Sequence, residues 1–133
     1  MAVLVDTSVW SLALRRDEQL NSPELKILIK ALDSGEEIYS SGIILQELLQ
    51  GFSGAKAARA IIERFAAIPM LVPDTQDHIE AAELRNKSRR KGVHIGTIDA
   101  LIAQLSLRYK LNLLTADKDF SHMSKVVKLE FAR

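Results

Sequence analysis

The stretch that determines the fold is Met1-Ala2-Val3-Leu4-Val5-Asp6-Thr7-Ser8. Its short apolar run, which contains two valines, has no polar face and is typical of a strand buried in a parallel sheet. Asp6 ends this strand, and open α/β sheets bind ligands in the crevice beyond the strand ends. An Asp in this position can also cap the helix that follows. Asp6 is therefore either a helix cap or part of a site.

Helical and strand patterns alternate along the rest of the chain. We expect helices over residues 8–16, 23–34, 43–50, 56–67 and 76–91, and another that begins at Thr97. We expect further strands at 37–40, 68–72, 111–115 and 126–129. This alternation predicts the α/β class, with a central, mainly parallel sheet between helical layers. The 133 residues suit one domain, 1–133, large enough to bury a core.

The composition excludes several classes of protein. The chain has no cysteine, which removes disulfides, thiolate nucleophiles and cysteine zinc sites. Its N-terminus lacks the pattern of a signal peptide, and no segment is long enough to span a bilayer. We therefore expect a soluble cytoplasmic protein. The formal net charge is only +1, so attraction to nucleic acid would need a local patch of basic residues.

Four carboxylates recur in settings that suggest a site: Asp6, Glu47, Asp99 and Asp117. Asp6 and Asp117 each follow an apolar strand, Asp99 lies in the first turn of a helix, and Glu47 interrupts an apolar helix. Capping, turn formation or exposure to water would explain each of them separately. If the four converge, their repulsion requires a cation, and oxygen ligands alone favour Mg²⁺ or Mn²⁺.

Several neighbouring groups are candidates for the outer shell of such a site. They are Thr7, Ser8, Thr97, Thr115 and Asp119. The hydroxyls could bind metal-coordinated water or phosphate, and helix capping is an equally good explanation for them. Asp119 could instead shape the turn before Phe120.

These motifs together resemble a known family. Val3 to Trp10, the isolated Glu47 after Ser40-Ser41, Gly96 to Ala103 and Leu113 to Phe120 look like a PIN-domain nuclease, and more narrowly like the toxin of a VapBC toxin–antitoxin pair. The resemblance covers essentially the whole chain in order. It implies a PIN-like three-layer sandwich and endoribonuclease activity on structured RNA such as tRNA or ribosomal RNA. It also implies a homodimer and a small VapB-like antitoxin as partners.

By this resemblance the catalytic acids are Asp6, Glu47, Asp99 and Asp117, around Mg²⁺ or Mn²⁺. Our mechanistic hypothesis is that Asp6, Asp99 and Asp117 hold the ion and that Glu47 orients or deprotonates the attacking water. In-line attack on a phosphodiester would then leave a 5′-phosphate and a 3′-hydroxyl.

Two basic segments are candidates for contact with RNA phosphates. The first lies before the loop that leads to Asp99, and the second follows the Asp6 segment; they comprise Arg85, Lys87, Arg89, Arg90 and Lys91, and Arg15 and Arg16. Cations at the end of a helix also suit its dipole, so a solvated surface remains the alternative.

Two other functions remain open at this point. An acidic pocket at strand tips with Lys118 nearby is also the arrangement of a phospho-receiver signalling module, although only one acid follows the first strand. A non-catalytic RNA-binding scaffold is the other alternative. Trp10 and the apolar stripe from Leu25 to Leu32 favour core packing, and a dimer or antitoxin contact is the alternative for them.

Overall fold

The computed structural model describes residues 1–15, 22–52 and 54–133. Within them the strands are β1 (Ala2–Val5), β2 (Glu37–Ser41), β3 (Met70–Leu71) and β4 (Asn112–Leu114). The helices are α1 (Thr7–Leu14), α2 (Pro23–Asp33), α3 (Gly42–Gly51), α4 (Ala55–Phe65), α5 (Thr75–Arg90), α6 (Thr97–Arg108) and α7 (Lys118–Met123). The alternation of strands and helices confirms the predicted α/β class.

All three strand pairings in the described sheet are parallel, in the order β3-β2-β1-β4. The first strand is central, and Val3, Leu4 and Val5 are completely buried, as their lack of a polar face predicts. From β1 the chain builds β2 and β3 on one side and then returns to add β4 on the other. The carboxyl end of β1 is therefore the topological switch point, where open α/β sheets bind ligands.

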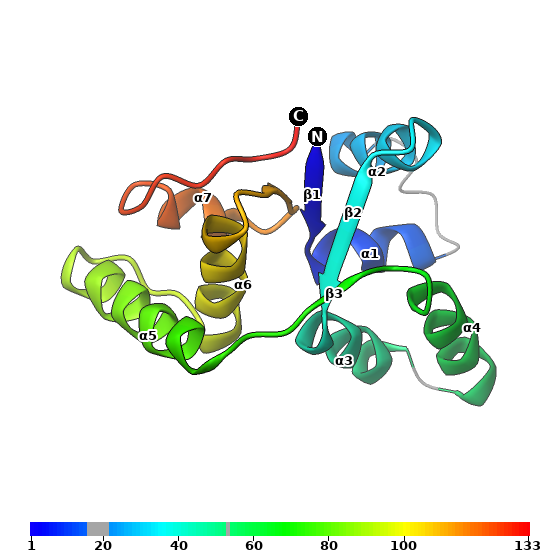
Figure 1. Ribbon diagram of the computed structural model, residues 1–133, viewed down its shortest axis with the longest axis horizontal. Helices are drawn as coiled ribbons and strands as arrows, with labels where there is room; N and C mark the ends of the chain where they lie inside the picture. Colours follow the sequence, from blue (N-terminus) through cyan, green and yellow to red (C-terminus); the bar gives the residue numbers. More distant parts are fainter. Residues whose placement is uncertain (16–21, 53) are drawn as a thin grey trace.

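The helices form two groups on either side of the strands. Figure 1 shows α5, α6 and α7 on one side and α1, α2 and α4 on the other. This arrangement follows from right-handed crossovers, because the chain reverses its direction across the sheet after β3. The three-layer prediction is confirmed. No helix in the described ranges is long and apolar enough to cross a membrane.

Local sequence signals explain where α2 begins and which of its residues pack inside. The Ser22 hydroxyl accepts a hydrogen bond from the backbone N–H of Leu25, and Pro23 is the first helical residue. Leu25 and Leu28 are buried. Ile29 and Leu32 are 48% and 51% exposed, so the predicted apolar stripe is only partly in the core.

Trp10 packs in the core, as we predicted. Its ring lies 5.0 Å from that of Phe65 at an angle of 59°, and both residues are buried. Tilted aromatic pairs of this kind stabilise a core beyond the area they bury. The contact joins α1 to α4 on one side of the sheet.

The prediction of a last strand at residues 126–129 is wrong. The backbone N–H groups of Val126 and Val127 both donate to the carbonyl of Met123, which makes this segment the turn that ends α7. The pairing with β4 occurs later, as a single parallel bridge between Phe131 and Leu113. The helix end takes up the donors that a strand would have needed.

The first helix is also shorter than the sequence suggested. It ends at Leu14, and the backbone N–H of Arg15 closes it by donating to the carbonyl of Ser11. Arg15 is exposed. Arg16, which we predicted to close this helix, lies outside the described residues.

Candidate active site

The carboxylate of Asp6 is buried at the carboxyl end of β1, with 5% of the residue exposed. Asp6 stands at the N-cap position of α1, yet its side chain makes no capping hydrogen bond. Its Oδ2 instead accepts the Ser8 hydroxyl at 2.8 Å and the Thr115 hydroxyl at 2.9 Å. The capping alternative for Asp6 therefore does not account for its side chain.

Two backbone N–H groups fix the direction of these hydrogen bonds. The Ser8 oxygen accepts from the N–H of Ala116, and the Thr115 oxygen accepts from the N–H of Asp117, both at 3.0 Å. Each hydroxyl is thus a bridge from a backbone donor to Asp6 Oδ2. No hydrogen bond among the described residues goes to the second oxygen of Asp6, Oδ1.

Glu47 is brought to the same edge of the sheet by α3, which begins directly after β2. Its Oε1 accepts the Thr7 hydroxyl at 2.8 Å, and the side chain is half-buried. Thr7 is the residue after Asp6, so this hydrogen bond ties Glu47 to the start of α1, next to Asp6. The charge in this apolar helix is therefore turned toward the sheet edge.

Three further carboxylates meet beyond the ends of β1 and β4. Asp99, Asp117 and Asp119 each have an oxygen within 4.8 Å of the others. Asp117 caps α7, because its Oδ1 accepts the backbone N–H of Asp119 at 2.9 Å. The sequence suggested Asp119 only as an outer-shell group. In the structure its carboxylate lies within 4.8 Å of those of Asp99 and Asp117, two of the predicted ligands.

The surroundings of Asp99 favour the protonated form of its carboxyl group. Burial, followed by the negative charges of Asp117, Asp6, Asp119 and Glu47, raises the pKa of Asp99 from 3.8 to about 7. No salt bridge between described residues involves any of these five carboxylates. The arrangement thus concentrates negative charge that no cation of the described residues balances by a salt bridge.

This donor set suits a hard divalent cation. It consists only of carboxylate and hydroxyl oxygens. Hydrogen bonds hold the carboxylates of Asp6 and Glu47 in place, and no described residue forms a salt bridge with them. Mg²⁺ and Mn²⁺ prefer such ligands, whereas zinc sites typically use histidine or cysteine. The residues present therefore fit the metal that the sequence suggested.

The predicted outer-shell hydroxyls have different roles in the structure. Ser8 and Thr115 hold Asp6, and Thr7 holds Glu47. Thr97 is exposed at the start of α6 and makes no side-chain hydrogen bond within the described part of the chain. It lines a groove instead.

The basic segment at the end of α5 is divided between different surfaces. Arg85 lines an open groove of about 590 Å³ together with Gln46 of α3 and Ile98 of α6, the neighbours of Glu47 and Asp99. Lys87 and Arg90 line a separate hollow. A helix turns about 100° per residue, so consecutive basic residues cannot share one face.

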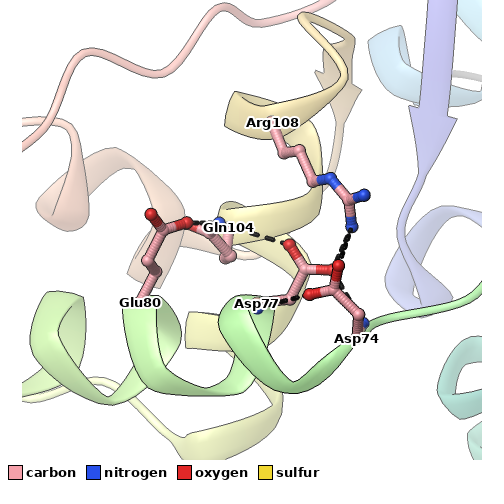
Figure 2. A network of polar contacts seen from close by, with 5 residues as sticks. All are labelled: Asp74, Asp77, Glu80, Gln104 and Arg108. Atoms are coloured by element: carbon pink, nitrogen blue, oxygen red, sulfur yellow. Dashed lines mark hydrogen bonds and ion pairs between the residues drawn. The ribbon is translucent and has the colours of Figure 1, made fainter.

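A buried polar network between α5 and α6 was missed by the sequence analysis. Asp77 is 1% exposed, and its carboxylate accepts from Gln104, from Arg108 and from the backbone of Asp74. Figure 2 shows these residues together with Glu80, which accepts the second contact of Gln104. The Asp-x-x-Asp spacing of a capping box was the available signal.

Comparison with known proteins identifies the family. The profile of the PIN domain matches residues 3–126 of the chain. The chain belongs to the PIN domain family. The match begins in β1 and ends in the turn after α7, so this PIN domain includes all five grouped acids.

The chain is similar in sequence to named ribonucleases and in fold to several solved structures. Ribonuclease VapC11 of Mycobacterium tuberculosis is 26% identical over 132 residues, which span 98% of the chain and 97% of that protein. The structure of VapBC2 from Rickettsia felis bound to a promoter DNA fragment has a TM-score of 0.76 at 18% identity, covering 98% and 97% of the two chains. The sarcin-ricin loop cleaving toxin VapC20 of Mycobacterium tuberculosis has a TM-score of 0.68 at 18% identity, covering 90% and 93%.

Proposed function

We propose that this PIN domain is a metal-dependent endoribonuclease and the toxin of a type II toxin–antitoxin pair. The observation that carries the proposal is the grouping of Asp99, Asp117 and Asp119, whose carboxylate oxygens lie within 4.8 Å of one another, at the edge of the sheet where Asp6 follows β1 and Thr7 holds Glu47. The names of its relatives support the choice of RNA as substrate. Structured RNA, either tRNA or ribosomal RNA, is the proposed substrate class.

The residues proposed to hold Mg²⁺ or Mn²⁺ are Asp6, Asp99 and Asp117. Asp119 is a fourth candidate, because its carboxylate lies within 4.8 Å of those of Asp99 and Asp117, whereas Asp6 is not part of that close group. A bound divalent cation would supply an activated water and would stabilise charge on a phosphoryl oxygen. Ser8 and Thr115 hold the carboxylate of Asp6 in place, because both donate to its Oδ2. Oδ1 of Asp6 accepts no hydrogen bond from the residues that the structure describes, so it would remain available as a ligand.

Glu47 is proposed to act on the attacking water. Thr7 holds one of its oxygens, which leaves the other to accept a proton or to orient a water molecule. In-line attack on the phosphodiester would release a 5′-phosphate and a 3′-hydroxyl. The exposed residues Lys87, Arg89, Arg90 and Lys91 are proposed as phosphate contacts, together with Arg15 and the undescribed Arg16.

The proposed partners are a second copy of this chain and a small VapB-like antitoxin. The antitoxin is supported by the resemblance of the fold to chains in VapBC crystal structures. The proposed activity also requires inhibition, because uncontrolled RNA cleavage would be harmful. A cytoplasmic location remains a prediction. Membership of the PIN family gives the phospho-receiver alternative no support. The non-catalytic scaffold remains as an outcome of the test.

The test is cleavage of total cellular RNA by the purified protein, freed of antitoxin, with Mg²⁺, Mn²⁺ or EDTA. Asp6→Asn is the informative variant, because an Asn side-chain oxygen can still accept from Ser8 and Thr115 while the charge is removed. Asp33→Asn, which removes an exposed charge on α2, is the matched control. We expect discrete fragments from the wild type and the control with metal only, and none from Asp6→Asn. Metal-dependent RNA binding without cleavage by the folded wild type would favour the scaffold.

A further inference from the structure

The loop at residues 92–96 delivers Asp99 to the acidic site. It leaves α5 through Gly92, whose φ of +79° favours glycine, and the N–H of Val93 donates to the carbonyl of Ser88 at 2.8 Å. Its last residue, Gly96, is the N-cap of α6 and has no side chain with which to cap the helix. The start of α6 therefore depends on other contacts for its position.

Arg85 provides such a contact. Its Nε donates to the backbone carbonyl of Ile95 at 3.0 Å. This hydrogen bond joins the middle of α5 to the residue before Gly96. The side chain of Ile95 is itself in the core, with 5% of the residue exposed. Ile95 is thus held on both its side chain and its carbonyl, about one helical turn along the chain from Asp99.

The surroundings of Arg85 differ from those of the other basic residues in its segment. Arg85 is half-buried, whereas Lys87, Arg89, Arg90 and Lys91 are exposed. It lines the groove between α3 and α6, the helices that carry Glu47 and Asp99. A planar guanidinium with one N–H committed to a carbonyl acts as a rigid tether, and a charge-assisted hydrogen bond of this kind is stronger than a neutral one.

We propose that Arg85 is a positioning residue, which holds the loop at residues 92–96 so that Asp99 lies beside Asp117. This assignment replaces the role in phosphate binding that the sequence suggested for Arg85. Its catalytic consequence rests on the proposed ribonuclease function, but the ordering of the loop does not. The two are therefore tested by separate measurements on the same variants.

The informative variant is Arg85→Met, which keeps an apolar stem and removes every N–H donor. The matched control is Arg59→Met, since Arg59 is exposed on α4. The first measurement is amide hydrogen exchange of the metal-free protein without RNA. We expect exchange at Val93 and Ala100, whose backbone N–H groups donate to Ser88 and Gly96 at the two ends of the loop, to rise about tenfold in Arg85→Met, from the loss of one charge-assisted hydrogen bond, and to be unchanged in the control. Unchanged exchange in Arg85→Met would overturn the proposal.

The second measurement is RNA cleavage with Mn²⁺, analysed for kcat, KM and the salt dependence of RNA binding. Misplacement of Asp99 predicts a kcat lowered by about 10- to 100-fold, with KM and the salt dependence unchanged. A raised KM with unchanged kcat and a flatter salt dependence would assign Arg85 to phosphate binding and refute the positioning role. If the wild type cuts no RNA while the exchange result is as expected, the proposed function fails and the tether stands.

Discussion

Asp99→Asn is predicted to stabilise the metal-free protein, although it removes a residue proposed for catalysis. Burial and four neighbouring carboxylates raise the pKa of Asp99 to about 7 from 3.8. A carboxyl whose pKa is higher in the folded state than in the unfolded state destabilises the fold when it ionises. This cost is absent below the unfolded pKa, grows as the pH rises toward 7, and is complete above 7. An uncharged Asn avoids it.

The size of the effect follows from the shift. Roughly three pKa units correspond to about 4 kcal/mol as an upper limit. Asp99 is only partly buried, and solvent screens its interactions with the other acids, so we expect about 1–2 kcal/mol. For a chain of 133 residues this gain raises Tm by about 3–7 °C.

The assay is thermal unfolding in EDTA at several pH values. At pH about 8 the variant should unfold at a higher temperature than the wild type, and the difference should vanish near pH ~3, below the unfolded pKa, where Asp99 is protonated in both states. Glu63→Gln, which removes an exposed acid on α4, is the control and should show little change. An Asp99→Asn variant that is no more stable than wild type at the higher pH would refute the reasoning, as would a gain independent of pH.

Three further outcomes are expected. Mn²⁺ should raise the Tm of the wild type by several degrees, since a bound cation relieves repulsion among the acids. The rise in Tm should be smaller for Asp117→Asn. Equal rises in the two proteins would contradict the metal site. Asp77→Ala should lower the free energy of unfolding in urea by about 2 kcal/mol, because it removes a buried acceptor shared by Gln104, Arg108 and the backbone N–H of Asp74 and leaves Arg108 with Asp74 alone. A loss below about 1 kcal/mol would mean that the network is not holding α5 to α6. Burial alone would raise the pKa of Asp77, but its hydrogen bonds from Asp74, Gln104 and Arg108 lower it. The contribution of Asp77 to the free energy of unfolding should therefore disappear as the pH falls through the acidic range. The unfolding curves of the wild type and Asp77→Ala should converge there. Phe65→Ala should lower the free energy of unfolding by about 3–4 kcal/mol. It should also reduce the near-ultraviolet circular dichroism of Trp10, because the Phe65 ring packs against the Trp10 ring. An unchanged Trp10 signal would contradict that packing.

Much of the fold was predictable because the decisive signals are local. The buried run of β1 has no polar face, and Ser22-Pro23 marks the start of α2 whatever the rest of the chain does. The positions of Asp6 and Asp117 follow from one rule, that the carboxyl ends of parallel strands share an edge. These inferences need no knowledge of contacts between distant side chains.

The failed or missing predictions concern tertiary contacts. Val126 and Val127 have strand propensity, but the end of α7 uses their backbone donors. Ile29 and Leu32 fit a helical stripe, yet the sheet covers only the narrower face that includes Leu28. The network of Asp77 depends on a neighbouring helix almost 30 positions later, which no local pattern reveals. The role of Asp119 depended on how α7 turns back toward α6.

The measurement that tests the central claim most directly is anomalous X-ray scattering from crystals of the protein soaked in Mn²⁺. The claim is that the acids at the strand ends form a divalent-cation site. The account predicts an anomalous peak among the carboxylates of Asp6, Asp99 and Asp117, with Glu47 close enough to reach a water on the ion. A well-ordered acidic site that holds no Mn²⁺ at millimolar concentration, or Mn²⁺ bound only elsewhere, would contradict it.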